Sequence, residues 1–240
     1  MAEPQPYKKP AVAAMFDNIA HRYDFLNHFL SFGIDRFWRR RTIEAVRGAY
    51  VNPRILDVAA GTADLSVEAL KLSPVHITGI DISDAMLERG RKKLAAKGLS
   101  GKIDLRSGDS ENIQFGDNCF DIAMVAFGVR NCSDPLRGMT EMTRVVRTGG
   151  TVLVLEFSKP AYFPLKQLYN LYFLNILPVI GRLFSKNKSA YRYLPDSVMR
   201  FPDNEKFMDI MKASGLSSVT MKQLTGGIVT IYRGLKPKVQ

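Results

Sequence analysis

The feature that most constrains the fold is a regular alternation of strand-like and helix-like segments in the middle of the chain. Short apolar runs typical of buried strands occur at 54–59, 76–81, 102–109, 120–128 and 151–158. Amphipathic helical patterns lie between them at 62–72, 84–97 and 135–146, and a Thr-Gly-Gly turn is expected at 148–150. Because parallel strands need crossover connections, this order predicts an α/β fold with a doubly wound, mostly parallel sheet covered by helices on both faces.

The C-terminal part of the chain follows a different pattern. A helix is expected over 203–214, with Gly215 as its stop signal. Two further strand patterns, 217–224 and 227–235, meet at Thr225-Gly226-Gly227. Such a short connection allows only a hairpin, so the last strand should run antiparallel. A seven-stranded sheet closed in this way is the Rossmann-like layout of class I methyltransferases, and a dinucleotide dehydrogenase sheet usually ends differently.

The rest of the chain adds helices to this core. We expect one domain over 1–240, because no internal repeat or low-complexity linker divides it. Its parts are N-terminal helices at 11–47, a ligand-binding core at 54–158, a helical cap at 159–201, and a last helix with a hairpin at 202–240.

Composition narrows the environment and the partners. The 34 Lys and Arg residues against 23 Asp and Glu residues give a net charge of +11, which fits either an anionic partner or a basic protein without one. Nucleic acid is disfavoured because the basic residues lack an aromatic stacking platform. Cys119 and Cys132 show neither metal spacing nor a disulfide pattern. With no secretory signal and no apolar run of bilayer length, these features predict a cytoplasmic protein without a metal.

The turn after the first strand, in "ILDVAAGTADLS" (55–66), carries one glycine where a dinucleotide fingerprint carries three. A pyrophosphate needs those glycines, whereas S-adenosylmethionine has no phosphate and offers an ammonium group instead. Asp57 suits that ammonium group, and Gly61 lets the backbone approach a ligand closely. We therefore predict that Asp57, Gly61 and Thr62 bind S-adenosylmethionine, although the turn alone also allows another nucleoside.

The next two strand ends supply further candidates. Asp81 ends the second strand about 20 residues after the turn, where a carboxylate can accept from both ribose hydroxyls; its alternative role is a helix cap. Asp109 can accept from the adenine amino group and Ser110 can face the ring, unless both belong to a solvated turn. These residues do not by themselves exclude NAD.

The segment after the fourth strand, "AFGVRNCSD" (126–134), points to a family. Together with 15–38, 55–66, 144–158, "YRYLPDSV" and "TGGIVTIYRGLKP", it resembles the ubiquinone/menaquinone biosynthesis C-methyltransferases over nearly the whole chain. The resemblance implies S-adenosylmethionine-dependent C-methylation of a polyprenylated quinol ring. The substrate would be demethylmenaquinol or, as the alternative, a methoxy-polyprenyl-benzoquinol. The sequence departs from the family at several positions without losing a group that the chemistry needs: Asp35, Ala60, Ala63, Asp109-Ser110, Ala126 and Thr148.

The resemblance also implies catalytic roles. Arg130 and Asn131 would lie by the substrate ring, with Arg130 acting as a cation that lowers the pKa of the quinol, since an arginine is a poor base. Tyr23 would close over cofactor and ring. The alternatives are a surface arginine and a core aromatic residue.

Three other titratable residues lie in or near these motifs. His21 and His28 are expected to be structural or solvated. Glu156 ends the fifth strand and either reaches the mouth of the pocket or caps the next segment.

The stretch 163–184 is apolar apart from a narrow stripe formed by Lys166, Gln167 and Asn170. A helix of this kind is buried or faces lipid. Basic residues follow at Lys186, Lys188, Arg192 and Arg200, so we expect either transient docking on anionic lipid at the inner face of the membrane or an ordinary cap. Homo-oligomerisation stays open, as do three other functions: a methyltransferase for another lipid or small molecule, an oxidoreductase, and a non-catalytic member of a quinone-synthesis complex.

Overall fold

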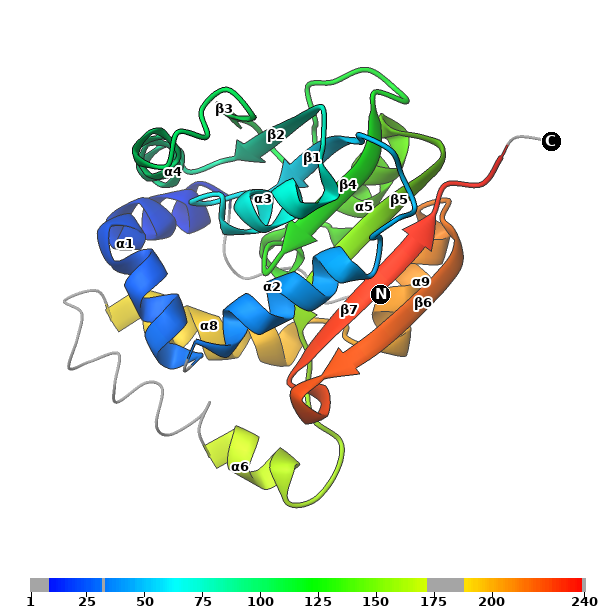
Figure 1. Ribbon diagram of the computed structural model, residues 1–240. Coiled ribbons are helices and arrows are strands. Elements are labelled where there is room, and N and C mark those ends of the chain that lie inside the picture. Colours follow the sequence, from blue (N-terminus) through cyan, green and yellow to red (C-terminus); the bar gives the residue numbers. More distant parts are fainter. Residues whose placement is uncertain (1–8, 32, 172–187, 239–240) are drawn as a thin grey trace.

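The computed structural model describes residues 9–31, 33–171 and 188–238, and a seven-stranded sheet forms its centre (Figure 1). The strand order is β3-β2-β1-β4-β5-β7-β6. β7 runs antiparallel to β5 and β6, and the other neighbouring strands are parallel. The strands are β1 (Arg54–Val58), β2 (His76–Asp81), β3 (Ile103–Ser107), β4 (Phe120–Ala126), β5 (Val146–Phe157), β6 (Ser217–Leu224) and β7 (Val229–Leu235). The predicted parallel sheet with a C-terminal hairpin is confirmed.

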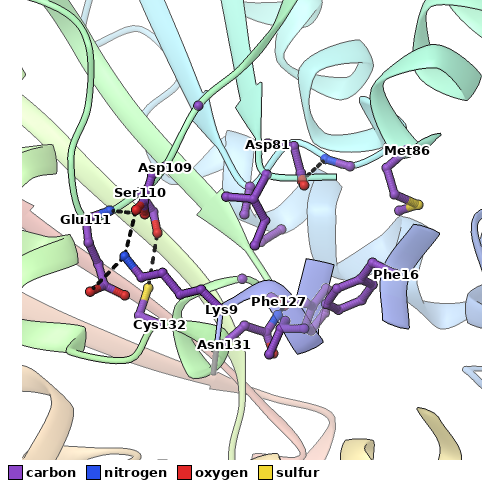
Figure 2. A pocket seen from close by; sticks show the side chains of 17 residues that line it. Lys9, Phe16, Asp81, Met86, Asp109, Ser110, Glu111, Phe127, Asn131 and Cys132 are labelled. Atoms are coloured by element: carbon purple, nitrogen blue, oxygen red, sulfur yellow. Dashed lines mark hydrogen bonds and ion pairs between the residues drawn. The ribbon is translucent and has the colours of Figure 1, made fainter. Parts of the chain in front are cut away.

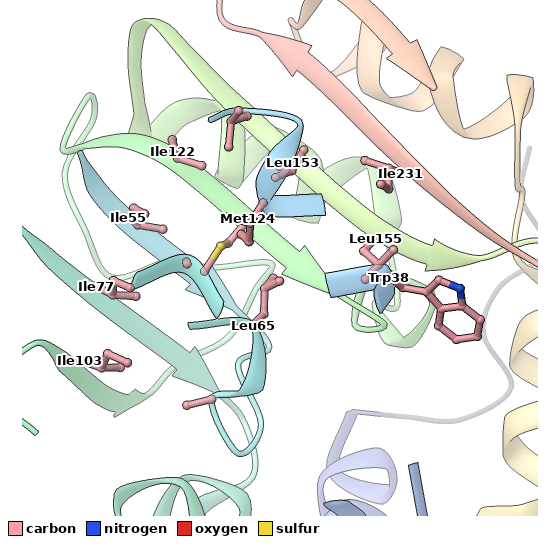
Figure 3. Packing of buried hydrophobic residues seen from close by; sticks show 14 of the residues in the cluster. Trp38, Ile55, Leu65, Ile77, Ile103, Ile122, Met124, Leu153, Leu155 and Ile231 are labelled. Carbon is pink, nitrogen blue, oxygen red and sulfur yellow. The ribbon is translucent and has the colours of Figure 1, made fainter. Parts of the chain in front are cut away.

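Helices cover both faces of the sheet (Figure 1). One face carries α2 (Ile34–Glu44), α3 (Asp64–Ala69) and α4 (Asp84–Ala96), and the other carries α5 (Pro135–Val145) and α9 (Glu205–Ala213). Because strand side chains alternate between faces, Ile55 packs in the cluster with Trp38 and Leu65 that Figure 3 shows. The adjacent Leu56 packs in the opposite cluster, which contains residues of α5 and α9.

The expected turn at 148–150 lies inside β5 rather than before it. Phe120 of β4 pairs with Val146, and Ile122 pairs with Thr151, so β5 bulges between these two pairs. Gly149 takes φ +77° in the bulge, which favours glycine. The strand therefore begins at Val146, earlier than its apolar pattern suggested, because it pairs with β4 on both sides of the two glycines.

The remaining α-helices of the described ranges are α1 (Lys9–Leu30), α6 (Leu165–Leu171) and α8 (Lys188–Arg200). α1 and α2 confirm that the N-terminal segment is helical, and α1 contacts α2, α4 and α8. Of the helix expected over 163–184, the structure describes the part that forms α6, and 172–184 lies outside the described residues. Throughout the described ranges, every helix is too short or too polar to cross a membrane.

Candidate functional site

A pocket of roughly 650 Å³, including the space open to solvent, lies at the carboxyl ends of the parallel strands (Figure 2). This edge is the usual ligand site of open α/β sheets, where the order of the strands reverses. The turns after β1, β2, β3 and β4 form the pocket together with one side of α1. The lining includes Lys9, Val12, Phe16, Ala59, Gly61, Asp81, Asp109, Ser110, Glu111, Phe127, Asn131 and Cys132. Five predicted site residues thus come together here: Gly61, Asp81, Asp109, Ser110 and Asn131.

Asp81 ties two walls of the pocket together. Its Oδ2 accepts a hydrogen bond from the backbone N–H of Gly61 (2.8 Å), and its Oδ1 accepts one from the backbone N–H of Ser83 (2.9 Å). Burial raises the pKa of Asp81, and these backbone hydrogen bonds oppose the shift. The N-cap of α4 is Ser83, which accepts from Met86 N, so Asp81 is not needed as the cap residue.

Asp57 and Thr62 lie behind this wall and do not belong to the pocket lining. The Asp57 side chain is almost fully buried and accepts a hydrogen bond from Ser66 Oγ at 2.5 Å. Thr62 Oγ1 accepts from Lys93 Nζ at 3.0 Å. Both residues therefore support the turn from behind, whereas the sequence pattern suggested direct contact with a ligand.

Because Asp57 is buried, the free energy of unfolding is expected to depend measurably on pH. Burial raises its pKa from 3.8 to about 7 in the folded chain. The folded state therefore holds this proton more tightly than the unfolded chain, and the resulting stability is lost as the pH rises from about 4 to about 7. When the pH rises from 5 to 8, the unsubstituted protein should lose on the order of 3 kcal/mol of its free energy of unfolding relative to Asp57→Asn, because the asparagine does not titrate. Urea denaturation at both pH values checks this, and parallel pH profiles would contradict it.

Lys9 was not predicted, and it occupies one end of the pocket (Figure 2). Its Nζ lies 2.7 Å from Asp109 Oδ2 and 3.1 Å from Glu111 Oε2. Partial burial would raise the pKa of Asp109, but the hydrogen bonds from Lys9 and from the backbone N–H of Glu111 bring it below its ordinary value. Asp17, further along α1, accepts from Ser83 Oγ at 2.5 Å. α1 is thus fixed across the pocket at two points.

Arg130 is buried beside Glu156 and is not part of the lining (both at most 5% exposed). Its Nη1 donates to Glu156 Oε1 (2.7 Å) and its backbone N–H donates to Glu156 Oε2 (3.2 Å). The guanidinium lies 5.3 Å from the centre of the Phe157 ring. Arg130 is therefore not a surface arginine. Glu156 is fully buried and outside the pocket lining, so it does not lie at the mouth of the pocket, and its carboxylate neutralises Arg130.

The backbone of Phe127 explains how Arg130 and Asn131 are held. Phe127 has φ +57°, an unusual conformation for a large side chain. Its carbonyl oxygen accepts from Arg130 Nη1 at 2.6 Å and from Asn131 Nδ2 at 3.4 Å. Both residues lie on the 3-10 helix Val129–Asn131. Strain at a turn of this kind commonly accompanies a functional site.

Tyr23, predicted to be catalytic, lies on α1, as do His21 and His28, which were expected to be structural or solvated. The side chains of all three fall outside the described part of the structure.

Replacing Gly128 with a larger residue is expected to destabilise the protein. A Cβ at this position would lie 2.6 Å from Ala59 Cβ and 2.9 Å from Val125 Cγ2. Overpacking of this kind costs about 1–3 kcal/mol, so Gly128→Ala should lower the melting temperature and displace the turn that carries Asn131. Gly116→Ala is the control, because its Cβ would meet only Cys119 Sγ at 3.6 Å. Equal melting temperatures for the two variants would contradict the expectation.

Solved structures show which fold class the sheet belongs to. The chain superposes with a TM-score of 0.65 on a solved S-adenosylmethionine-dependent methyltransferase of Thermotoga maritima, described as a possible histamine N-methyltransferase. The two are 18% identical, and the match covers 93% of this chain and 99% of that one. The seven-stranded sheet with its antiparallel β7 is accordingly the fold of class I S-adenosylmethionine-dependent methyltransferases.

The sequence comparisons give the family. The ubiE/COQ5 methyltransferase family matches residues 5–236. The chain is 48% identical over 231 residues to the ubiquinone/menaquinone biosynthesis C-methyltransferase UbiE of Geotalea daltonii, covering 95% of this chain and 97% of the relative. It is 43% identical over 230 residues to the demethylmenaquinone methyltransferase of Bacteroides fragilis, covering 95% and 94%. The chain belongs to the ubiE/COQ5 methyltransferase family.

Proposed function

We propose that this protein transfers the methyl group of S-adenosylmethionine to a ring carbon of a polyprenylated naphthoquinol, converting demethylmenaquinol to menaquinol. The observation that carries the proposal is the near full-length similarity to two relatives that are both named for menaquinone biosynthesis or its precursor. The first relative is also named for ubiquinone biosynthesis, so a methoxy-polyprenyl-benzoquinol is the alternative substrate.

The pocket suits the cofactor. Asp81 offers carboxylate lone pairs beyond its two backbone hydrogen bonds, which fits the ribose hydroxyls. Asp109 and Ser110 lie where they could hold adenine once Lys9 releases Asp109. When bound, S-adenosylmethionine supplies an activated methyl group.

Asn131 is the group that we place against the quinol. It lines the pocket, whereas Arg130 lies behind the lining with its charge balanced by Glu156. We therefore assign Arg130 a positioning role, and Tyr23 remains a candidate for closing the site from α1.

The reaction needs a nucleophilic ring carbon. Loss of a quinol hydroxyl proton to water pushes electron density onto the ring, and the ring carbon then takes the methyl group as the sulfur–methyl bond breaks. The proton on that carbon leaves, the oxygen regains one, and a single proton is released overall. An N–H group aimed at the quinol oxygen stabilises the intermediate anion.

The test is a product assay with the purified protein and isotopically labelled S-adenosylmethionine. Reduced demethylmenaquinol and a reduced methoxy-polyprenyl-benzoquinol are supplied separately, and the product is identified by mass spectrometry. Label in the naphthoquinol ring supports the proposal. Label only in the benzoquinol would overturn the substrate assignment, and no transfer to either quinol would overturn the activity. A protein that assembles normally into a quinone-synthesis complex but transfers no methyl group would be a non-catalytic member of that complex.

We propose further that the segment around α6 docks on anionic lipid, where a polyprenyl quinol resides. Four apolar side chains are more than half exposed there: Tyr162, Phe163, Leu168 and Leu171. The neighbouring Lys166 is also exposed, and apolar surface beside basic residues suits anionic headgroups.

Sedimentation with vesicles containing phosphatidylserine tests the docking. The double variant Phe163→Ser, Leu168→Ser should bind several-fold more weakly than Val51→Ser, which removes an apolar side chain that is 91% exposed elsewhere. Neutralising Lys186 and Lys188, whose side chains lie outside the described residues, should also weaken binding. Vesicle binding unchanged by these substitutions would reject the docking face.

A further inference from the structure

Tyr193 of α8 reaches the pocket-lining residue Asn131 from a segment distant in sequence. Its hydroxyl lies 2.9 Å from Asn131 Oδ1, and 62 positions separate the two residues. Tyr193 is 3% exposed, and α8 packs against the 3-10 helix that carries Asn131. The bond therefore lies in a partly buried environment, with Tyr193 itself buried, where a hydrogen bond is held more firmly than in water.

The nitrogen end of the amide faces the backbone at 3.4 Å. Asn131 Nδ2 donates to the carbonyl oxygen of Phe127. A carbonyl oxygen can only accept, so the amide nitrogen must face Phe127 and the amide oxygen must face Tyr193. Tyr193 must then donate, and one N–H of Asn131 remains for a ligand in the pocket.

We propose that Tyr193 is a positioning residue that fixes the polarity of Asn131, so that Asn131 presents an N–H donor, and not its carbonyl oxygen, to the quinol oxygen. The inference rests on the proposed function, in which Asn131 contacts the quinol. A donor there stabilises the quinolate, whereas a rotated amide would place an oxygen against a developing negative charge. Tyr193 thereby contributes to catalysis through Asn131 without touching the reacting atoms.

Tyr193→Phe tests the inference, because it removes the hydroxyl and retains the ring. Single-turnover methyl transfer should slow about tenfold, while the Kd for S-adenosylhomocysteine stays within twofold. The acid limb of the rate–pH profile should move to higher pH, since the quinol ionises less readily. Tyr232→Phe is the matched control: Tyr232 is also buried, and its hydroxyl accepts from the backbone N–H of Asn204 instead of lying against Asn131.

A double-mutant cycle separates positioning from general destabilisation. Asn131→Ala should slow the reaction at least as much as Tyr193→Phe, and combining the two should cost little beyond Asn131→Ala alone. Asn131→Asp, which cannot donate when ionised, should be as slow as Asn131→Ala. Additive effects, or a Tyr193→Phe rate equal to that of Tyr232→Phe, would overturn the inference while leaving the proposed function intact. Absence of methyl transfer in the unsubstituted protein would instead reject the proposed function.

Discussion

Replacing Glu156 with alanine is expected to lower the free energy of unfolding by about 3–5 kcal/mol, because it leaves the buried Arg130 cation without its neutralising carboxylate. The carboxylate accepts from Arg130 Nη1, from the backbone N–H of Arg130 and from the backbone N–H of Phe157. Replacing Glu156 removes all three hydrogen bonds, and because Glu156 is fully buried, water does not readily replace them. Urea denaturation at pH 7 measures the change.

A paired variant distinguishes charge burial from packing. Arg130→Met combined with Glu156→Leu removes both charges and keeps comparable volume, so much of the lost stability should return. Methyl transfer should stay low in the double variant, because Arg130 Nη1 also donates to the carbonyl of Phe127, which holds the turn before Asn131. A double variant no more stable than Glu156→Ala would show that the ion pair itself is not the cause.

Replacing Asp81 with alanine should weaken the binding of S-adenosylhomocysteine by about 10²–10³-fold. Each hydrogen bond from a ribose hydroxyl to a carboxylate contributes about 1.5–2 kcal/mol, and 1.4 kcal/mol corresponds to a factor of ten in Kd. The substitution also removes the carboxylate that accepts from the backbone N–H groups of Gly61 and Ser83. The bond from Gly61 ties the turn after β1 to the end of β2. Isothermal titration calorimetry gives the Kd directly.

The control for this substitution is Asp104→Ala on the adjacent β3. Asp104 makes an ion pair with Arg106 and takes no part in the pocket lining. Its replacement should leave the Kd within about twofold. If Asp81→Ala bound S-adenosylhomocysteine as well as Asp104→Ala does, the ribose role of Asp81 would be rejected.

Part of the site could be predicted because it depends on local pattern and sheet geometry. Asp81 ends a strand, and Gly61, Asp109 and Asn131 lie in the segments that follow strands; parallel strands place such positions at one edge. Their convergence in a single pocket follows from the strand order. Asp57 shows the limit of local pattern, because the pattern places it correctly in β1, whereas the direction of its side chain, towards Ser66, depends on packing.

The amino-acid sequence by itself determined the parallel sheet, the C-terminal hairpin and the edge at which the pocket lies, because periodicity and short connections act over neighbouring residues. Only the tertiary structure decided which polar groups meet. Glu156 lies 26 positions from Arg130, Tyr193 lies 62 from Asn131, and Asp109 lies 100 from Lys9. No local pattern encodes such pairs, since each forms when separate elements pack and a buried polar group takes the partner that the packing brings within reach.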